Sequence, residues 1–432
     1  MNNLKFHKKR LNCRLCNEKL LILVLPLSPV PIGEHYSEQK GLNADIRYPI
    51  DLYQCENCKC VQTADDIDSN FLWEGYTYFS GQTAGIIKHF KKFVESVAAK
   101  NLLSSTTKVF DIGSNDGSLL KEFEKRTCNV FGIDPSDIAA KKAEASGINT
   151  YIGLFSDAVL DKFPHGWDKV DLITAFNVFA HSSDMQGMIE GVKKMLNPDG
   201  LFYFEVQYLL DISNKKLLGT IFHEHMIHYS LVAAKNFLEA NEFKLVSFER
   251  NSIQMGSIIF CAAHQKSTHE VSPQINNQIQ LELESGIVSD EWAKDFQNYI
   301  SEQKNKSLSI ISSYKKMGFK VLGYGAARSG PTLAIQYGLE GCIQYLLDDH
   351  ESKLNKFGVF ESLQVLPTSV INDDSKKIVV ILAWLHAKNI IKKHIDFLES
   401  GGVFLVLWPN VKVIDQTNYA LWLEEHDKVK ND

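Results

Sequence analysis

The apolar positions between about residues 85 and 265 switch repeatedly between the spacing of strands and the spacing of helices. Residues 108–112 form a short β-branched and aromatic run that ends in a glycine-rich turn, and residues 118–126 then show helical periodicity. The run 170–177 is mostly apolar, as expected of a strand buried on both faces of a parallel sheet. This alternation predicts one doubly wound α/β domain.

The end of this domain carries a different pattern. A helical stretch over 184–195 is expected to stop at Asn-Pro-Asp-Gly, residues 197–200. The segments 244–250 and 257–264 read as strands joined around Gly256. We therefore expect the sheet to finish in an antiparallel pair.

A second α/β pattern follows, between about residues 300 and 412. Residues 275–317 have helical periodicity, and the strand, glycine turn and helix signature returns at 320–330. Further strands are expected at 342–350, 377–384 and 402–408.

Two Cys-x-x-Cys pairs, Cys13/Cys16 and Cys55/Cys58, open the chain. Zinc prefers four tetrahedral ligands, and a full thiolate shell leaves no open position, so the expected zinc is structural. The residues between the pairs must loop out, and Cys60 is an alternative to Cys58. Unrelated cysteines are a competing interpretation; a thioredoxin-like dithiol is disfavoured because neither pair opens a helix after a strand.

These patterns predict an α/β protein in three parts with a tail. A zinc-binding module spans 1–80, the doubly wound Rossmann-like domain 81–270, a second Rossmann-like α/β domain 271–415, and a frayed helical tail 416–432.

Composition and charge narrow the class of protein. The chain has 432 residues, 44% hydrophobic and 23% charged, with a net charge of −6. This is typical of a soluble globular protein and disfavours nucleic acid as a partner. The apolar stretch 20–32 is broken by prolines and too short to span a bilayer, and no signal peptide is visible. We expect a cytoplasmic protein with no membrane partner; the oligomeric state is left open and is compatible with a monomer.

The first glycine-rich turn points to a nucleoside cofactor. The spacing Asp-x-Gly-x-x-x-Gly from Asp111 to Gly117 lacks the third glycine of pyrophosphate binders, and Asp134 ends the next strand, where a carboxylate can bind ribose hydroxyls. An adenosine without phosphates indicates S-adenosylmethionine; a tight turn of any α/β fold is the alternative. The expected cofactor contacts are Asp111, Gly113, Ser114, Asn115, Gly117, Asp134, Phe155 and Asn177.

A histidine-rich loop follows the fifth strand, at the sheet edge where ligands bind. It contains His223, Glu224, His225 and His228, and His181 lies after the fourth strand. Because histidine titrates near neutral pH, it is the natural general base. A zinc site and buried core histidines are alternatives. Glu205, at the end of the fifth strand, is either a second carboxylate of the cleft or a structural hydrogen-bonding group.

Together these motifs resemble the nucleotide-sugar C-methyltransferases. The resemblance rests on the two Cys pairs, Tyr-Thr-Tyr-Phe-Ser-Gly at 76–81, the turn 111–120 and the loop 222–231, and it covers most of the chain. It implies a zinc module over the active site, a class I methyltransferase domain that binds S-adenosylmethionine, and a C-terminal domain that helps to hold the sugar nucleotide. The substrate implied is a dTDP-4-keto-deoxyhexose, methylated at C3.

The resemblance also implies roles for individual residues. His225 would remove the C3 proton, with His181 in the same cleft, and Glu224 would orient the base or contact substrate. Tyr76 and Tyr78 are the candidate donors to the enolate oxygen. Aromatic packing is the alternative for the tyrosines. The expected substrate contacts are Tyr78, Glu205, Phe222, His223, Tyr324 and Arg328.

The chain departs from the family pattern at several positions. Phe222 stands where a tyrosine is usual, the cation of the second glycine turn is Arg328, one place along, and Pro331 replaces asparagine. Leu385 follows Trp384 in place of asparagine. O- or N-methylation of a related metabolite is therefore the second hypothesis. A non-catalytic zinc-finger adaptor and an NAD-dependent enzyme are weaker ones.

Overall fold

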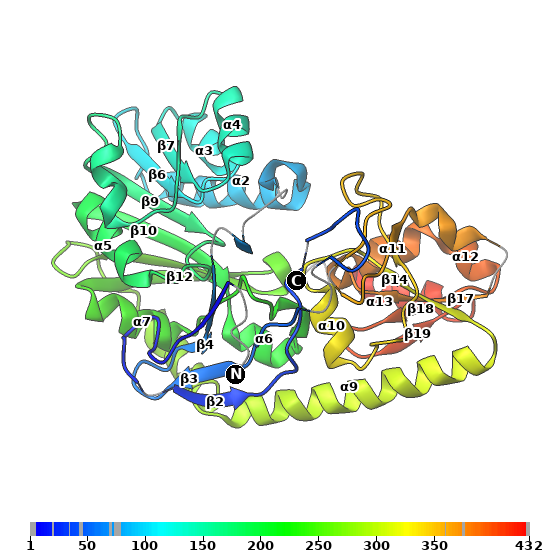
Figure 1. The fold of residues 1–432 in the computed structure, drawn as a ribbon. Coiled ribbons are helices and arrows are strands. Elements are labelled where there is room, and N and C mark those ends of the chain that lie inside the picture. Colours follow the sequence, from blue (N-terminus) through cyan, green and yellow to red (C-terminus); the bar gives the residue numbers. More distant parts are fainter. Residues whose placement is uncertain are drawn as a thin grey trace.

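The structure is a computed structural model and describes residues 6–428 apart from 20, 34, 43–45, 69–70, 73–78, 359 and 374–375. Within these residues the strands form two large sheets and two small ones. Figure 1 shows the large sheets at opposite ends of the molecule, with the long helix α9 (Glu291–Lys316) running beneath. The predicted α/β architecture, with two Rossmann-like units, is confirmed.

Seven strands form the central sheet, in the order β12-β13-β10-β9-β6-β7-β8. The strands from β10 to β8 run parallel, whereas β13 is antiparallel to both β10 and β12. The strands are β6 (Lys108–Ile112), β7 (Asn129–Asp134), β8 (Thr150–Ile152), β9 (Val170–Phe176), β10 (Leu196–Gln207), β12 (Phe243–Asn251) and β13 (Ser257–His264). The helices of this unit are α2 (Ala84–Ala99), α3 (Ser118–Glu124), α4 (Asp137–Ala145), α5 (Met185–Met195), α6 (Leu209–Lys215) and α7 (Leu231–Ala240).

The end of the central sheet matches one expectation and corrects another. The antiparallel pair β12/β13, joined around Gly256, is confirmed. Residues 197–200 do not end a helix: α5 ends at Met195 and β10 begins at Leu196. A register shift between Leu196 and Leu201 accommodates the Asn-Pro-Asp-Gly sequence inside the strand pairing.

The N-terminal module is built from short strands. β2 (Leu21–Leu25), β3 (Leu52–Cys55) and β4 (Val61–Thr63) form an antiparallel sheet. β11 (Ile227–His228), from the histidine-rich loop, adds a fourth strand to it by pairing with β4. The N-terminal module and the loop therefore share one sheet.

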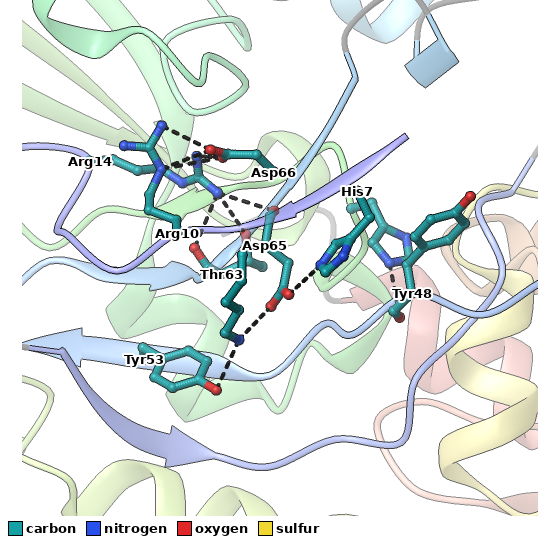
Figure 2. Close-up of polar contacts among 10 residues, drawn as sticks. His7, Arg10, Arg14, Tyr48, Tyr53, Thr63, Asp65 and Asp66 are labelled. Atoms are coloured by element: carbon teal, nitrogen blue, oxygen red, sulfur yellow. Dashed lines mark hydrogen bonds and ion pairs between the residues drawn. The ribbon is translucent and has the colours of Figure 1, made fainter. Parts of the chain in front are cut away.

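An ionic network around the buried Asp65 and Arg14 side chains holds the first strand in place (Figure 2). β1 (His7–Lys9) pairs with β5 (Asp65–Ile67). The Asp65 carboxylate, whose side chain is only 1% exposed, lies 2.6 Å from His7 Nε2 and accepts a hydrogen bond from Lys9. Asp66 pairs with Arg10 and Arg14. Such desolvated charges are stable only when paired, which ties the chain start to the module.

The segment between the Cys pairs does more than loop out. Tyr48 and Val30 form an isolated β-bridge within this segment. Other residues of the segment contact the C-terminal unit. Tyr36 Oη donates a 2.8 Å hydrogen bond to the Ala326 carbonyl, and Arg47 forms an ion pair with Glu340 at 2.7 Å. The segment, residues 26–51, therefore bridges two parts of the protein.

Six strands form the C-terminal sheet, in the order β16-β15-β14-β17-β18-β19, all parallel except β19. The strands are β14 (Lys320–Tyr324), β15 (Leu346–Leu347), β16 (Val365–Leu366), β17 (Lys377–Ile381), β18 (Val403–Val406) and β19 (Lys412–Ile414). The helices are α8 (Gln274–Glu284), α9, α10 (Gly330–Gln336), α11 (Ala387–Lys393), α12 (Ile395–Glu399) and α13 (Tyr419–Lys428). Helix α9 contacts β2, α6 and β14 and so links all three parts.

Among the residues described, no helix is long and apolar enough to cross a membrane. The predicted domain limits at residues 80, 270 and 415 stay predictions.

Candidate active site

The four predicted metal ligands lie together in the N-terminal module. The sulfur atoms of Cys13, Cys16, Cys55 and Cys58 all lie within 4.8 Å of one another, and the Cys13–Cys58 and Cys16–Cys55 pairs are 3.5 Å apart. This donor set fits one tetrahedral thiolate-bound ion. The Cys60 thiol is buried, lies 3.7 Å from its neighbour's carbonyl at Val61, and is not part of the cluster.

The first glycine turn joins β6 to α3. Asp134 at the end of β7 accepts hydrogen bonds from the backbone N–H groups of Asn115, at 2.9 Å, and Ser136, at 2.8 Å. Gly113 has φ 69°, and a Cβ there would lie 2.3 Å from the Val178 side chain, so only glycine suits this position. The turn thereby places the buried Asp134 carboxylate beside the backbone around Gly113.

Two further features of the turn suit a polar ligand. Burial raises the pKa of Asp111 to about 7, although Thr174 donates a 2.6 Å hydrogen bond to it. Within the described part of the chain, the buried Ser114 hydroxyl has no hydrogen-bond partner. A buried polar atom without a partner is costly unless a ligand or water satisfies it.

Of the other predicted cofactor contacts, Asn177 follows β9, next to Val178 whose side chain lies against Gly113, and Phe155 lies elsewhere. Asn177 has φ 57° and donates its backbone N–H to the Glu205 carbonyl at 2.9 Å. The Phe155 ring is buried against Phe110, with 5.6 Å between centroids, and under Gly191 of α5. Phe155 therefore packs in the core.

The segment before α2 lies on the glycine turn. The backbone N–H of Ser80 donates to the Asn115 side chain, and that of Gly81 to Asp116, each at 3.0 Å. Lys142 lies over the Phe79 ring at 3.9 Å. The predicted residues Tyr76 and Tyr78 fall outside the described residues.

The histidine-rich loop orients one imidazole closely. His225 Nδ1 lies 2.6 Å from the Thr220 carbonyl oxygen, its ring stacks on His181 with centroids 5.0 Å apart, and Phe222 lies 4.0 Å away. Because a carbonyl only accepts, Nδ1 carries the proton and Nε2 keeps its lone pair. Burial lowers the pKa of His225 to about 4, and the charge of Arg328 also lowers it.

The neighbouring histidines are held inside the protein. His223 Nε2 lies 3.2 Å from the Tyr48 carbonyl, and the two rings meet edge to face at 6.0 Å. Burial lowers the pKa of His223 to about 4 and that of His228 to about 3. His223 thus faces the N-terminal module.

Two acidic residues predicted for the site, Glu224 and Glu205, pair with charged or polar side chains. Glu224 forms an ion pair with Arg328 of the second glycine turn. Glu205 is buried, lies 2.8 Å from His89 Nε2 and accepts from Asn251 at 2.7 Å. The structure thus brings His225, His181, Glu224 and Arg328 together, and Glu205 forms a separate cluster beneath α2.

The second glycine turn borders a pocket. Tyr324 Oη lies 3.1 Å from His394 Nε2 in the C-terminal core, and Ala326 N–H donates to Asp348 at 2.8 Å. Residues of the N-terminal segment and the C-terminal unit line the pocket together: Gly33, Tyr36, Gly325, Ala326, Ala327, Gly330, Pro331, Leu346, Gly358, Phe360 and Leu382.

Three family models match consecutive parts of the chain. A domain described as zinc binding matches residues 13–72, a methyltransferase domain 86–248, and a C-methyltransferase C-terminal domain 252–409. The chain is 26% identical to C-methyltransferase NovU of Streptomyces niveus over 93% of this chain and 96% of that protein. The chain is therefore a methyltransferase that is similar to this C-methyltransferase over nearly its whole length.

Other matches cover less of the chain. A ubiquinone biosynthesis O-methyltransferase of Actinobacillus pleuropneumoniae serotype 7 is 35% identical over 22% of this chain and 44% of its own length. The crystal structure of magnesium protoporphyrin IX methyltransferase from Synechocystis PCC 6803 with bound SAH has a TM-score of 0.34 at 17% identity, covering 42% of this chain and 84% of that one.

S-adenosylmethionine is the methyl donor of this C-methyltransferase, and zinc is its structural metal. When bound, the donor supplies an electrophilic methyl group on a sulfonium. Asp134, Ser114 and the backbone around Gly113 are the groups at the first glycine turn that fit its nucleoside. The four-cysteine cluster fits the zinc.

Sequence reasoning missed several residues of this site. His89 and Asn251 hold Glu205, and Tyr48 holds His223. No local pattern marks them, because each meets its partner across a long stretch of chain.

Proposed function

We propose that this C-methyltransferase acts on a keto-deoxy nucleotide-sugar of the dTDP-4-keto type and methylates C3 through an enolate. The observation that carries the proposal is the state of His225. Its Nδ1–H is bound to Thr220, and its low pKa leaves Nε2 unprotonated at neutral pH. A fixed, neutral imidazole is the group needed to remove a proton from a carbon next to a ketone.

The surroundings of His225 support the same chemistry. A proton α to a ketone is acidic because the resulting charge is delocalised onto oxygen, and a cation nearby stabilises that charge. Arg328 places a positive charge close enough to lower the pKa of both His225 and His181. Tyr76 and Tyr78 stay predicted donors to the enolate oxygen.

The C-terminal unit supports a nucleotide-linked substrate. A pocket lies at the carboxyl ends of β14 and β15, where Rossmann-like sheets bind ligands. Gly325 and Gly330 of the second glycine turn line this pocket. We place the nucleotide on this side and the sugar toward His225. A reducing compartment, the cytoplasm, suits the free thiolates of the zinc site.

Product analysis tests this function. The enzyme is incubated with methyl-labelled S-adenosylmethionine and a panel of keto and non-keto nucleotide-sugars, and products are identified by mass spectrometry. We expect a label on carbon, only with 4-keto sugars, and deuterium wash-in at C3 without the donor. A label on oxygen or nitrogen, with no wash-in by an active enzyme, would instead support O- or N-methylation.

A further inference from the structure

The ion pair between Arg328 and Glu224 joins the C-terminal unit to the histidine-rich loop. Arg328 follows β14 and precedes α10, and Glu224 is the residue next to His225. The side chains are 18% and 9% exposed. An ion pair so poorly solvated is screened little by salt, and removal of either partner leaves a charge without compensation.

The backbone of Arg328 is held from behind by the N-terminal segment. A Cβ at Gly33 would lie 2.6 Å from the Arg328 carbonyl oxygen and 2.9 Å from its Cα, so the two chains touch there. Two residues earlier, the Ala326 carbonyl accepts from Tyr36 and its N–H donates to Asp348. The Arg328 guanidinium therefore extends from a turn whose backbone these contacts hold in place.

The histidine-rich loop, which carries Glu224 at the other end of the ion pair, is also held by contacts with other elements. Met226 N–H donates to the Ala180 carbonyl at 3.1 Å, and the following two residues pair with β4. A Cβ at Gly219 would lie 2.2 Å from Trp384 Nε1, so the C-terminal unit also packs on the start of the loop. The backbone at both Arg328 and Glu224 is thus held by contacts with neighbouring elements.

The ionisable groups that face His225 come from several elements. His181 follows β9 and stacks on it, His228 lies on β11, Glu224 is its neighbour and Arg328 comes from the second glycine turn. Arg328 supplies the only fixed positive charge among these four, and this charge lowers the pKa of His225 and His181, after burial.

We propose that Arg328 is a positioning residue of the reaction: the C-terminal unit uses it to hold Glu224 and to keep a positive charge beside His225. The inference rests on the proposed role of His225 as base. It assigns Arg328 to the loop and not to the phosphates of the substrate. It follows that the C-terminal unit sets the pKa of His225 in addition to binding the substrate.

Titration of His225 tests this without any sugar substrate. Histidine-labelled full-length enzyme is followed by NMR between pH 3.5 and 8, and the His225 signal is identified by its absence in His225→Asn. We expect R328Q to raise the pKa of His225 by about 1 unit, because a like charge nearby disfavours the imidazolium. E224Q should lower it, because a negative charge is lost, and R328K should leave it near the native value.

Arg47→Gln is the matched control, because it breaks another Arg–Glu pair between the N-terminal segment and the C-terminal unit, far less buried at 30% and 39%. We expect it to leave the titration unchanged. An R328Q titration that matches R47Q would overturn the inference. E224Q still reports on the charges that face His225 if R328Q does not fold.

Activity provides the second readout. With the keto sugar that the product panel identifies, the acid limb of kcat/KM should move to higher pH in R328Q and not in R328K. If no keto sugar is methylated, the proposed function fails while the NMR titration still decides the role of Arg328. If R328Q mainly raises KM with an unchanged acid limb, Arg328 is a substrate contact and not a positioning residue.

Discussion

His225 Nδ1 lies 2.6 Å from the carbonyl oxygen of Thr220, and this contact decides which imidazole nitrogen can act as a base. The carbonyl accepts the Nδ1 proton, so the lone pair is on Nε2. The ring is also held between His181 and Phe222. The loop therefore presents one oriented, uncharged base.

Replacing that base should stop turnover without affecting the donor. We expect His225→Ala to lower kcat by at least about 10²-fold, the usual contribution of a general base. S-adenosylmethionine should still bind, as measured by calorimetry. The exposed His165→Ala is the control and should keep full activity. Unchanged turnover in His225→Ala would remove His225 from the mechanism.

The pKa values of the loop histidines predict an acid-sensitive fold. Burial lowers the pKa of His223 and His225 to about 4 and that of His228 to about 3, against about 6.5 in the unfolded chain. Their stabilising contribution is complete above pH about 6.5 and is lost as the pH falls through 4. Asp111, with its pKa raised to about 7, acts in the opposite sense over the same range.

His181 and His394 also have lowered pKa values, and Asp134 and Glu282 have raised ones, so among the residues described five histidines oppose three carboxyl groups. We therefore expect the free energy of unfolding to fall by several kcal/mol between pH 6.5 and 4. Urea unfolding at a series of pH values measures this. The variant His228→Gln should show a shallower decline than the native protein; an equal slope in both would contradict the assignment of His228.

Asp134 should govern donor affinity. The Asp134→Asn change removes the charge that accepts from two backbone N–H groups and that we predict to bind the ribose, so we expect S-adenosylmethionine to bind about 10-fold or more weakly. Asp137→Asn, on the exposed first turn of α4, keeps the neighbouring helix and should bind normally. Calorimetric Kd values compare the two, and equal values would place the ribose elsewhere.

Zinc removal should unfold the N-terminal module. We expect one zinc ion per chain by elemental analysis, and a lower Tm after chelation, since structural zinc contributes directly to folding. Cys16→Ser should lose the metal. Cys60→Ala should keep it at a cost of about 1 kcal/mol, typical of deleting a small buried group. Zinc loss in Cys60→Ala would exchange the roles of Cys58 and Cys60.

Gly219→Ala tests whether the C-terminal unit supports the loop. Its Cβ would lie 2.2 Å from Trp384 Nε1, so we expect a loss of about 1–3 kcal/mol and reduced activity. At Gly85 of α2 a Cβ meets nothing within 4 Å, and Gly85→Ala should be neutral or slightly stabilising. A fully active Gly219→Ala enzyme would show that Trp384 does not position the loop.

Local sequence patterns were sufficient for the elements and for the isolated motifs. The alternation around 108–126 and the signature at 320–330 predict two α/β units because helix and strand periodicity depends on neighbouring residues only. The Cys pairs and the turn from Asp111 to Gly117 are similarly local. The misassigned helix end at 197–200 arose because strand pairing with β9 outweighed a strong turn signal.

Tertiary structure alone decided how these motifs form one site. β11 joins the sheet of the N-terminal module, Tyr36 reaches Ala326, and Arg328 meets Glu224, and each of these contacts joins residues at least about a hundred positions apart. Such contacts depend on burial, on charge compensation and on close approach at glycines such as Gly33, which no periodicity records. The chain by itself determined which chemistry was available, and packing decided which groups face His225.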